Sequence, residues 1–295
     1  MRYLAGFMKL TNLIRLIRYR FFLFAGVLPY FLGQAIAFSL HKTLNYAFLW
    51  WGFVGILLVL AAVELFNEYF DSKEGGDRIF SQAESDIPNY FFGLGILAVG
   101  LAFIIALYLT LQTGWPVLLF SFLGVLGAYF YVGPPIKWAY RGFGETVIAL
   151  CYGPFMVLGS YYIQTQRIDF VPFFVSLISG LSVFCLAVTN EIPDFYQDRL
   201  VGKQNIVVRI GRQKAVVLLV FCLTGIFLLL ALGVILGKIP PLSMVAAVAL
   251  PWLLKSIKIA QKNYDNPEAF VFAVNTIVIT HIVIVLSLGI SFLMD

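Results

Sequence analysis

Two short acidic motifs hold the residues of this chain whose types and spacing could do chemistry. The first reads NEYFD over residues 67–71, and the second reads NEIPD over residues 190–194. Each motif ends a long apolar run, and each is followed by one more acid, Asp77 after the first and Asp198 after the second. This shared context predicts that the two motifs act together.

Each motif would present a row of oxygen side chains, because residues four apart share a helix face. If the two rows met in a bundle, several like charges in a partly desolvated site could not all stay ionised without cations. Oxygen ligands with no Cys or His nearby favour a hard cation such as Mg²⁺, shared with substrate phosphates. A solvated acidic helix end would explain one motif alone, but it explains the matched pair poorly. The two rows are Asn67 with Asp71, and Asn190 with Asp194 and Asp198.

A third polar segment, YFYVGPPIKWAYRGFGE, covers residues 129–145. Its Gly-Pro-Pro sequence breaks a helix, and Lys137 and Arg141 follow among several Tyr and Trp residues. A basic pair beside a carboxylate–metal site is the complement that a diphosphate needs. A plain cytoplasmic loop with interfacial aromatic residues explains the segment equally well. Two basic residues follow the second motif, Lys203 and Arg209. They would either contact phosphate or serve only as charges that set the membrane topology, and the second interpretation is favoured.

The composition defines an all-α polytopic membrane protein. Of the 295 residues, 61% are hydrophobic and 12% are charged, and the mean hydropathy is +0.93. An ordinary soluble domain is about 25% charged. Neither a soluble globular protein nor a nucleic-acid-binding protein fits these values. The three Cys residues lack C-x-x-C spacing and the two His residues lie far apart, so neither type indicates a metal or disulfide role.

Nine membrane-spanning helices are expected, since a span needs about 20 apolar residues. Residues 1–295 would form a single domain, with pseudo-repeats over about 21–131 and 143–260 and a last helix over 269–293. The expected spans are 21–40, 46–66, 89–111, 115–131, 143–163, 170–190, 214–236, 239–260 and 269–293.

The basic residues predict the orientation in the cell membrane. All but Lys42, Arg167 and Lys238 of the 20 Lys and Arg residues fall on one side of the nine spans, which the positive-inside rule makes cytoplasmic. The N-terminus and both acidic motifs lie on this side. The first 20 residues indicate no cleaved signal peptide, and their arginines predict a basic amphipathic helix on the cytoplasmic surface, with Arg15, Arg18 and Arg20.

These segments resemble the UbiA-type family of intramembrane aromatic prenyltransferases, over nearly the whole chain. The resemblance lies in NEYFDSKEGGD, YVGPPIKWAYRGFGE and NEIPDFYQDRLVGKQNIVVRIG. Asp77, six residues after Asp71, is similar to the menaquinone-type branch, which acts on 1,4-dihydroxy-2-naphthoate. The 4-hydroxybenzoate branch usually has this acid four residues after, where this chain has Gly75. Glu68 stands where many members have Asp.

The resemblance implies that the nine helices surround a central cavity. It also implies Mg²⁺-dependent transfer of a polyprenyl group from polyprenyl diphosphate to an aromatic acceptor within the lipid bilayer. Its metal ligands would be Asp71, Asp194 and Asp198, with Asp77 and Glu68 as further candidates. The remaining roles are substrate contacts. Asn67 and Asn190 would orient carboxylates or contact phosphate, Lys137, Arg141 and Lys203 would grip the diphosphate, and Tyr131 would face the allylic cation.

The acceptor and the catalytic base stay open. A dihydroxynaphthoate is the first choice of acceptor, with 4-hydroxybenzoate, homogentisate, a porphyrin or a glycerol-phosphate ether as alternatives. The base would be the acceptor's own carboxylate or phenolate, or Glu145. A cation-coupled transporter is the rival interpretation, although transporter sites usually lie near the midplane. Glu64 and His281 lie deeper in the apolar runs. For Glu64 either a function or hydration beside the motif is expected, and for His281 a role in helix packing.

Overall fold

The computed structural model describes residues 22–74 and 87–295, and every regular element within them is helical. Asp77 and the predicted N-terminal amphipathic helix with Arg15, Arg18 and Arg20 lie outside the described residues. Helices suit an apolar chain because they satisfy every backbone hydrogen bond within the segment, as the bilayer interior requires.

All nine predicted spans lie on helical segments. Seven of the described helical segments are long and apolar enough to cross a membrane, and Pro116–Phe130 is a shorter apolar helix. The first span consists of a π-helical turn, η1, followed by α3. The segments are η1 (Phe22–Val27) with α3 (Leu28–His41), α4 (Tyr46–Glu74), α5 (Tyr90–Thr113), α6 (Pro116–Phe130), α7 (Gly144–Leu150) with η4 (Cys151–Phe155) and α8 (Met156–Thr165), α9 (Phe170–Glu191), α12 (Arg212–Ile235), η5 (Pro241–Ala249) with α13 (Leu250–Asn263), and α14 (Pro267–Met294).

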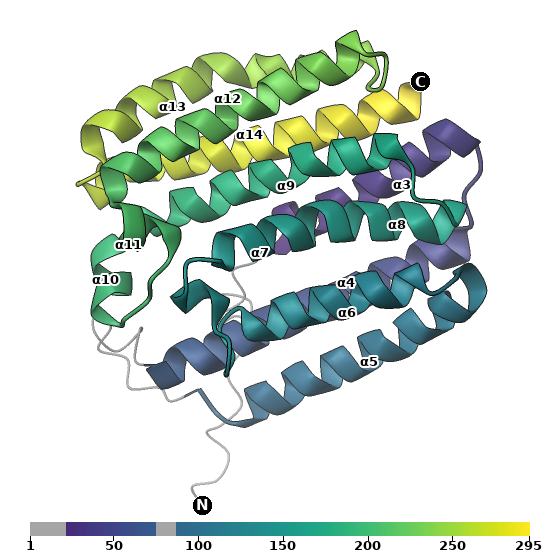
Figure 1. Cartoon of the computed structure of the whole chain (residues 1–295), viewed down its shortest axis with the longest axis horizontal. Helices are drawn as coiled ribbons and strands as arrows, with labels where there is room; N and C mark the ends of the chain where they lie inside the picture. Colours follow the sequence, from purple (N-terminus) through teal and green to yellow (C-terminus); the bar gives the residue numbers. More distant parts are fainter. Residues whose placement is uncertain (1–21, 75–86) are drawn as a thin grey trace, which may run out of the picture.

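The long helices lie side by side in layers, with α5 along one flank and α12 and α13 along the other (Figure 1). Between the flanks, α4 packs on α5, α3 packs on α8 and α14, and α9 packs on α12. The core is apolar and includes Tyr161, Ile178 and Ile226, each fully buried.

Short elements gather at one end of the bundle, opposite the C-terminus. Figure 1 shows α10 (Phe195–Leu200) and α11 (Ile206–Ile210) at this end, near the last turns of α4. A 3₁₀ turn, η3 (Trp138–Tyr140), follows the Gly-Pro-Pro break. All three polar segments identified in the sequence therefore reach the same end of the molecule.

The second acidic motif is not one continuous helix, which corrects the expectation that its three oxygen side chains share a helix face. α9 ends at Glu191, and α10 begins only after Asp194. Pro193 lies in the break, where its missing N–H cannot extend the hydrogen-bond ladder of α9. The first motif does lie within one helix, because α4 continues to Glu74.

Close backbone packing fixes α9 against the segment that precedes α8. A Cβ atom on Gly153 of η4 would lie 2.5 Å from Gly180 Cα and 2.7 Å from Ser176 O, both on α9. Only a residue without a side chain allows this approach, because both neighbours are backbone atoms.

Gly153→Ala should therefore destabilise the protein by about 1–3 kcal/mol, the usual cost of overpacking a core. The measurement is the thermal unfolding midpoint of the purified protein in detergent. Gly289→Ala is the matched control, because a Cβ there meets no atom within 4 Å. Equal midpoints for Gly153→Ala and Gly289→Ala would contradict the packing argument.

Candidate active site

Both acidic motifs line one cavity of about 990 Å³ that runs between α4, α5, α6, α8 and α9. Their shared wall is polar at the end of the bundle where α10 lies, and the rest of the lining is mostly apolar. Motifs 123 residues apart in the sequence thus reach a common space. The motif side chains that line it are Asn67, Glu68, Asp71, Asn190, Glu191, Asp194 and Asp198.

The first motif presents its side chains from one face of α4. Asn67, Glu68 and Asp71 follow the helical spacing that places residues three and four apart on one side. The Asn67 Oδ1 atom is buried, and no donor among the described residues reaches it. A buried amide oxygen without a partner is costly in a folded protein, so this atom is suited to a ligand that the cavity would hold.

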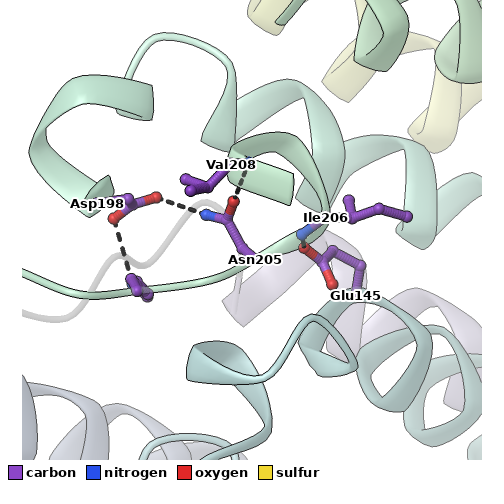
Figure 2. Close-up of polar contacts among 6 residues, drawn as sticks. Glu145, Asp198, Asn205, Ile206 and Val208 are labelled. Carbon is purple, nitrogen blue, oxygen red and sulfur yellow. Dashed lines mark hydrogen bonds and ion pairs between the residues drawn. The ribbon is translucent and has the colours of Figure 1, made fainter. Parts of the chain in front are cut away.

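Asp198 is held by the loop that follows it (Figure 2). The residue is 7% exposed, and its Oδ2 accepts a hydrogen bond from Asn205 Nδ2 at 2.6 Å. The Asn205 Oδ1 in turn accepts from the Val208 N–H at 2.8 Å and caps the N-terminus of α11. One fully buried amide therefore orients the carboxylate and begins the next helix.

The pKa of Asp198 is raised above its usual value, chiefly because burial removes water from the carboxylate. Lys203, whose Nζ lies 3.7 Å from Asp198 Oδ1, lowers the pKa, and the charges of Asp194 and Asp71 raise it. The hydrogen bond from Asn205 lowers it as well. Six acidic residues line the cavity, whereas Lys203 is the one basic residue among the described residues that line it, so the formal charge of the lining is negative.

Glu191 and Glu145 form a carboxyl pair beside these acids. Glu145 is 1% exposed, and its Oε1 accepts a hydrogen bond from the Ile206 N–H at 2.7 Å (Figure 2). The Oε2 atoms of both residues are buried without a donor among the described residues, and the two carboxyl groups lie within hydrogen-bonding range of each other. The two buried carboxyl groups therefore add to the acidic character of this end of the cavity.

Glu191 is a cavity residue that the sequence analysis did not select. Its signal was present, because Glu191 holds the same place in the second motif as Glu68 holds in the first. Glu145, named as one possible base, does not line the cavity. Its observed contacts are with Glu191 and with the first turn of α11.

The basic groups are arranged differently from the predicted Lys137–Arg141 pair. Neither Lys137 nor Arg141 lines the cavity, and Arg141 is exposed and donates to Pro135 O at 3.1 Å. Lys203 does line the cavity, which favours a phosphate contact over a purely topological charge. The Nζ atoms of Lys137 and Lys203 lie 5.5 and 5.9 Å from the centre of the Tyr140 ring, another cavity residue that the sequence analysis missed.

Tyr131 lies at the C-terminal end of α6 and faces the acids across the cavity. Its pKa is raised well above 10, first by burial and then by the negative charges of four carboxyl groups. The Tyr131 hydroxyl therefore stays neutral at physiological pH. The four groups come from four elements and are Glu191, Glu145, Asp71 and Asp198.

The oxygen side chains alone do not form a finished metal site. In residues 22–74 and 87–295, no three Asp, Glu, His or Cys side chains are close enough together to hold a metal ion. Carboxylates on opposite sides of a cavity suit an ion that also binds phosphate oxygens and water, as Mg²⁺ usually does. Such an arrangement suits a phosphorylated substrate that has an apolar chain.

Comparison with known proteins agrees with this class. The family described as UbiA prenyltransferases matches residues 26–277. The chain is 27% identical over 241 residues to the 1,4-dihydroxy-2-naphthoate octaprenyltransferase of Bacillus subtilis, covering 79% of this chain and 77% of that protein. It is 25% identical over 257 residues to the 2-carboxy-1,4-naphthoquinone phytyltransferase of Synechocystis, covering 82% and 80% of the two chains.

Solved structures share the fold at low sequence identity. A digeranylgeranylglyceryl phosphate synthase superposes with a TM-score of 0.71 at 17% identity, covering 97% of this chain and 99% of that chain. A UbiA homologue of Archaeoglobus fulgidus, solved with DMAPP and Mg²⁺, superposes with a TM-score of 0.54 at 15% identity, covering 95% and 98%. The chain belongs to the UbiA prenyltransferase family. It is an enzyme that transfers prenyl groups, and the transporter interpretation is withdrawn.

Asp198→Asn should raise the thermal stability of the substrate-free protein in EDTA at neutral pH. The raised pKa of Asp198 means that folding disfavours its ionised form, so the wild-type protein loses stability as pH rises through that pKa. The amide removes this loss, and the gain over wild type should shrink at acidic pH, where Asp198 is protonated. An unfolding midpoint measured from pH 5 to 8 checks this, and a gain that grows toward acidic pH would contradict it.

Asn205→Ala should reduce prenyl transfer and lower the unfolding midpoint. The substitution removes a helix cap, which contributes about 1 kcal/mol, together with the donor that orients Asp198. Asn205→Asp keeps a capping oxygen but puts a second carboxylate against Asp198, so it should impair transfer more than it impairs stability. Gln204→Ala, at an exposed neighbour, is the control. Wild-type transfer by both Asn205 variants would contradict the role.

Proposed function

We propose that this prenyltransferase moves a polyprenyl group from polyprenyl diphosphate to a quinone-precursor aromatic acceptor, 1,4-dihydroxy-2-naphthoate being the first choice, in a Mg²⁺-dependent reaction. The observation that carries the proposal is the convergence of Asp71, Asp194 and Asp198 on one cavity with an excess of negative charge. Divalent cations with a diphosphate would balance this charge. The apolar remainder of the cavity suits an isoprenoid chain.

Relatives support the choice of acceptor. The protein of Bacillus subtilis is named for transfer to 1,4-dihydroxy-2-naphthoate, and a relative from Mycobacterium leprae, 25% identical over 258 residues, has the same name. The six-residue spacing between Asp71 and Asp77 also favours this branch. The digeranylgeranylglyceryl phosphate synthase shares only the fold with this chain, so it does not favour a glycerol-phosphate acceptor.

The donor set fits Mg²⁺. Asp71, Asp194 and Asp198 would be the ligands, with Glu68 and Asp77 as further candidates, and the unpartnered Asn67 Oδ1 is available to a ligand on the same wall. When bound, Mg²⁺ would neutralise the diphosphate and stabilise the charge that develops on this leaving group. Asn205 holds Asp198 in the orientation seen here, so the carboxylate would need little rearrangement.

Lys203 and Lys137 would bind the diphosphate from the side of Tyr140. Asn190, which also lines the cavity, would contact phosphate or orient a carboxylate. The face of the Tyr131 ring would stabilise the allylic cation, and its neutral hydroxyl would not compete for the proton that the acceptor loses. Arg141 has no such role in the geometry observed.

The isoprenoid chain would occupy the apolar part of the cavity. Phe103 and Phe122 line it and are 55% and 57% exposed, so the cavity is continuous with the outer surface of α5 and α6, where lipid would lie. In the reaction, the allylic C–O bond breaks and its electron pair leaves with the diphosphate. A ring carbon of the acceptor then forms the new C–C bond, and the ring regains aromaticity by losing a proton or a carboxyl group.

The positions of the basic residues support placing this chemistry on the cytoplasmic side of a cell membrane. The repeated N-E-x-x-D motif, which ends α4 and α9, supports two pseudo-repeated halves that each contribute one acidic row.

Asp71→Ala and Asp194→Ala should each abolish prenyl transfer, because each removes a carboxylate that the metal and diphosphate need. The measurement is transfer of labelled prenyl groups in membranes, using prenyl diphosphates of several lengths and a panel of naphthoate, benzoate, homogentisate, porphyrin and glycerol-phosphate acceptors. EDTA should stop the wild-type reaction and added Mg²⁺ should restore it.

Asp169→Asn is the matched control, since Asp169 lies outside the cavity lining and accepts a hydrogen bond from Tyr161. It should keep transfer close to wild type. Near-normal turnover in Asp71→Ala or Asp194→Ala would contradict the site, and exclusive transfer to a non-aromatic acceptor would contradict the proposed function.

A further inference from the structure

Glu64 is a carboxylate in the wall of the cavity that the proposed metal site does not use. It lies on α4, its side chain is 8% exposed, and it lines the cavity one helical turn before Asn67. The cavity residues that precede it on the same face of α4 are Ile56, Val59 and Leu60, all apolar. An ionisable side chain inside a membrane span is expensive and therefore indicates function.

The duplicated motifs separate Glu64 from the diphosphate machinery. Both motifs contain the same Asn, Glu and Asp at the same spacing. Three residues before each Asn, however, the first motif has Glu64 and the second has Ala187, and both residues line the cavity. The two motifs have the same residues where they would bind metal and diphosphate. They differ at Glu64 and Ala187, which fits contact with a second substrate, the acceptor, from one motif alone.

Glu64 lies farther along α4 from the polar end of the cavity than the proposed metal ligand Asp71 does, at a level where the acceptor rather than the diphosphate would bind. Glu64 lies seven residues before Asp71, which is about 10 Å along the axis of α4. Tyr152 of η4 also lines the cavity, and it lies close enough to Glu64 for the two side chains to interact electrostatically. A carboxylate and a phenol thus form a polar spot in an otherwise apolar part of the cavity.

We propose that Glu64 binds the aromatic acceptor by accepting a hydrogen bond from one of its ring hydroxyl groups. The inference rests on the proposed function and names the acceptor class more narrowly, as a hydroxylated ring. A hydrogen bond to a carboxylate is strong and directional, so it would fix which ring carbon faces the allylic carbon. It would also draw the hydroxyl proton away from the ring oxygen and make the ring a better nucleophile. No bond to Glu64 forms or breaks.

The test compares Glu64→Ala, Glu64→Leu and Glu64→Gln with the wild-type enzyme, measuring KM separately for the acceptor and for the prenyl diphosphate. Loss of a hydrogen bond to a charged group should raise the acceptor KM roughly tenfold to a hundredfold in the Ala and Leu variants. Gln, whose carbonyl oxygen still accepts, should restore part of the loss. The KM for prenyl diphosphate should stay within about twofold of wild type. Thr113→Ala, at a buried polar residue that lies outside the cavity lining, is the control and should leave both constants unchanged.

Acceptor analogues with a methylated hydroxyl complete the test. In the wild-type enzyme, methylation of the hydroxyl that Glu64 binds should raise KM by the factor seen in Glu64→Leu. In Glu64→Leu the same methylation should have little further effect, because the partner is already missing. If Glu64→Leu does not fold, the near-isosteric Glu64→Gln takes its place, and methylation should then raise the acceptor KM by a smaller factor in Glu64→Gln than in the wild-type enzyme.

Unchanged acceptor KM in all three variants, or equal losses from methylation in wild type and Glu64→Leu, would overturn the inference. Either result leaves the proposed function intact if labelled prenyl transfer to aromatic acceptors persists. Wild-type enzyme that transfers to no aromatic acceptor would instead refute the proposed function, and Glu64 would lose its role with it.

Discussion

The structure depends on one electrostatic constraint, which is the gathering of carboxylates in a cavity that the bilayer shields from water. Asp71, Asp194 and Asp198 line it from α4, the α9–α10 break and α10, and Lys203 is the one basic residue among the described residues of the lining. Keeping these charges close together lowers the folding stability of the substrate-free protein, and bound cations and diphosphate would offset this loss. The stability of the empty protein and the strength of substrate binding are therefore linked through the same residues.

Hydrogen bonds from outside the cavity hold this arrangement. Asn205 joins Asp198 to the first turn of α11, and Glu145 accepts a hydrogen bond from the Ile206 N–H and lies within hydrogen-bonding range of Glu191. The N-terminus of a five-residue helix thus fixes two acids that arrive from different segments. The loop after the second motif is short and would be flexible on its own, so these buried contacts supply the order that a metal site requires.

The cavity combines two environments that the reaction must keep apart. Its polar end would bind the diphosphate, and its apolar part would exclude water from an allylic cation. Glu64 and Tyr152 form a small polar exception within the apolar part. Because the halves of the protein differ at Glu64 and Ala187, a duplicated scaffold can treat its two substrates differently. The two motifs differ in backbone as well, because the helix breaks at Pro193 in the second motif and continues through the first.

The sequence by itself determined the nine apolar segments, the helical class and the pairing of two N-E-x-x-D motifs, because these follow from local composition and spacing. It also placed Asp71, Asp194 and Asp198 at one end of the bundle. Only the tertiary structure decided which neighbours join them. Lys203 faces the cavity and Arg141 does not, although both are basic loop residues, and Asn205 and Glu145 meet across 60 residues of chain at α11. The directions of loop side chains depend on long-range packing and hydrogen bonds, which residue type and spacing do not encode.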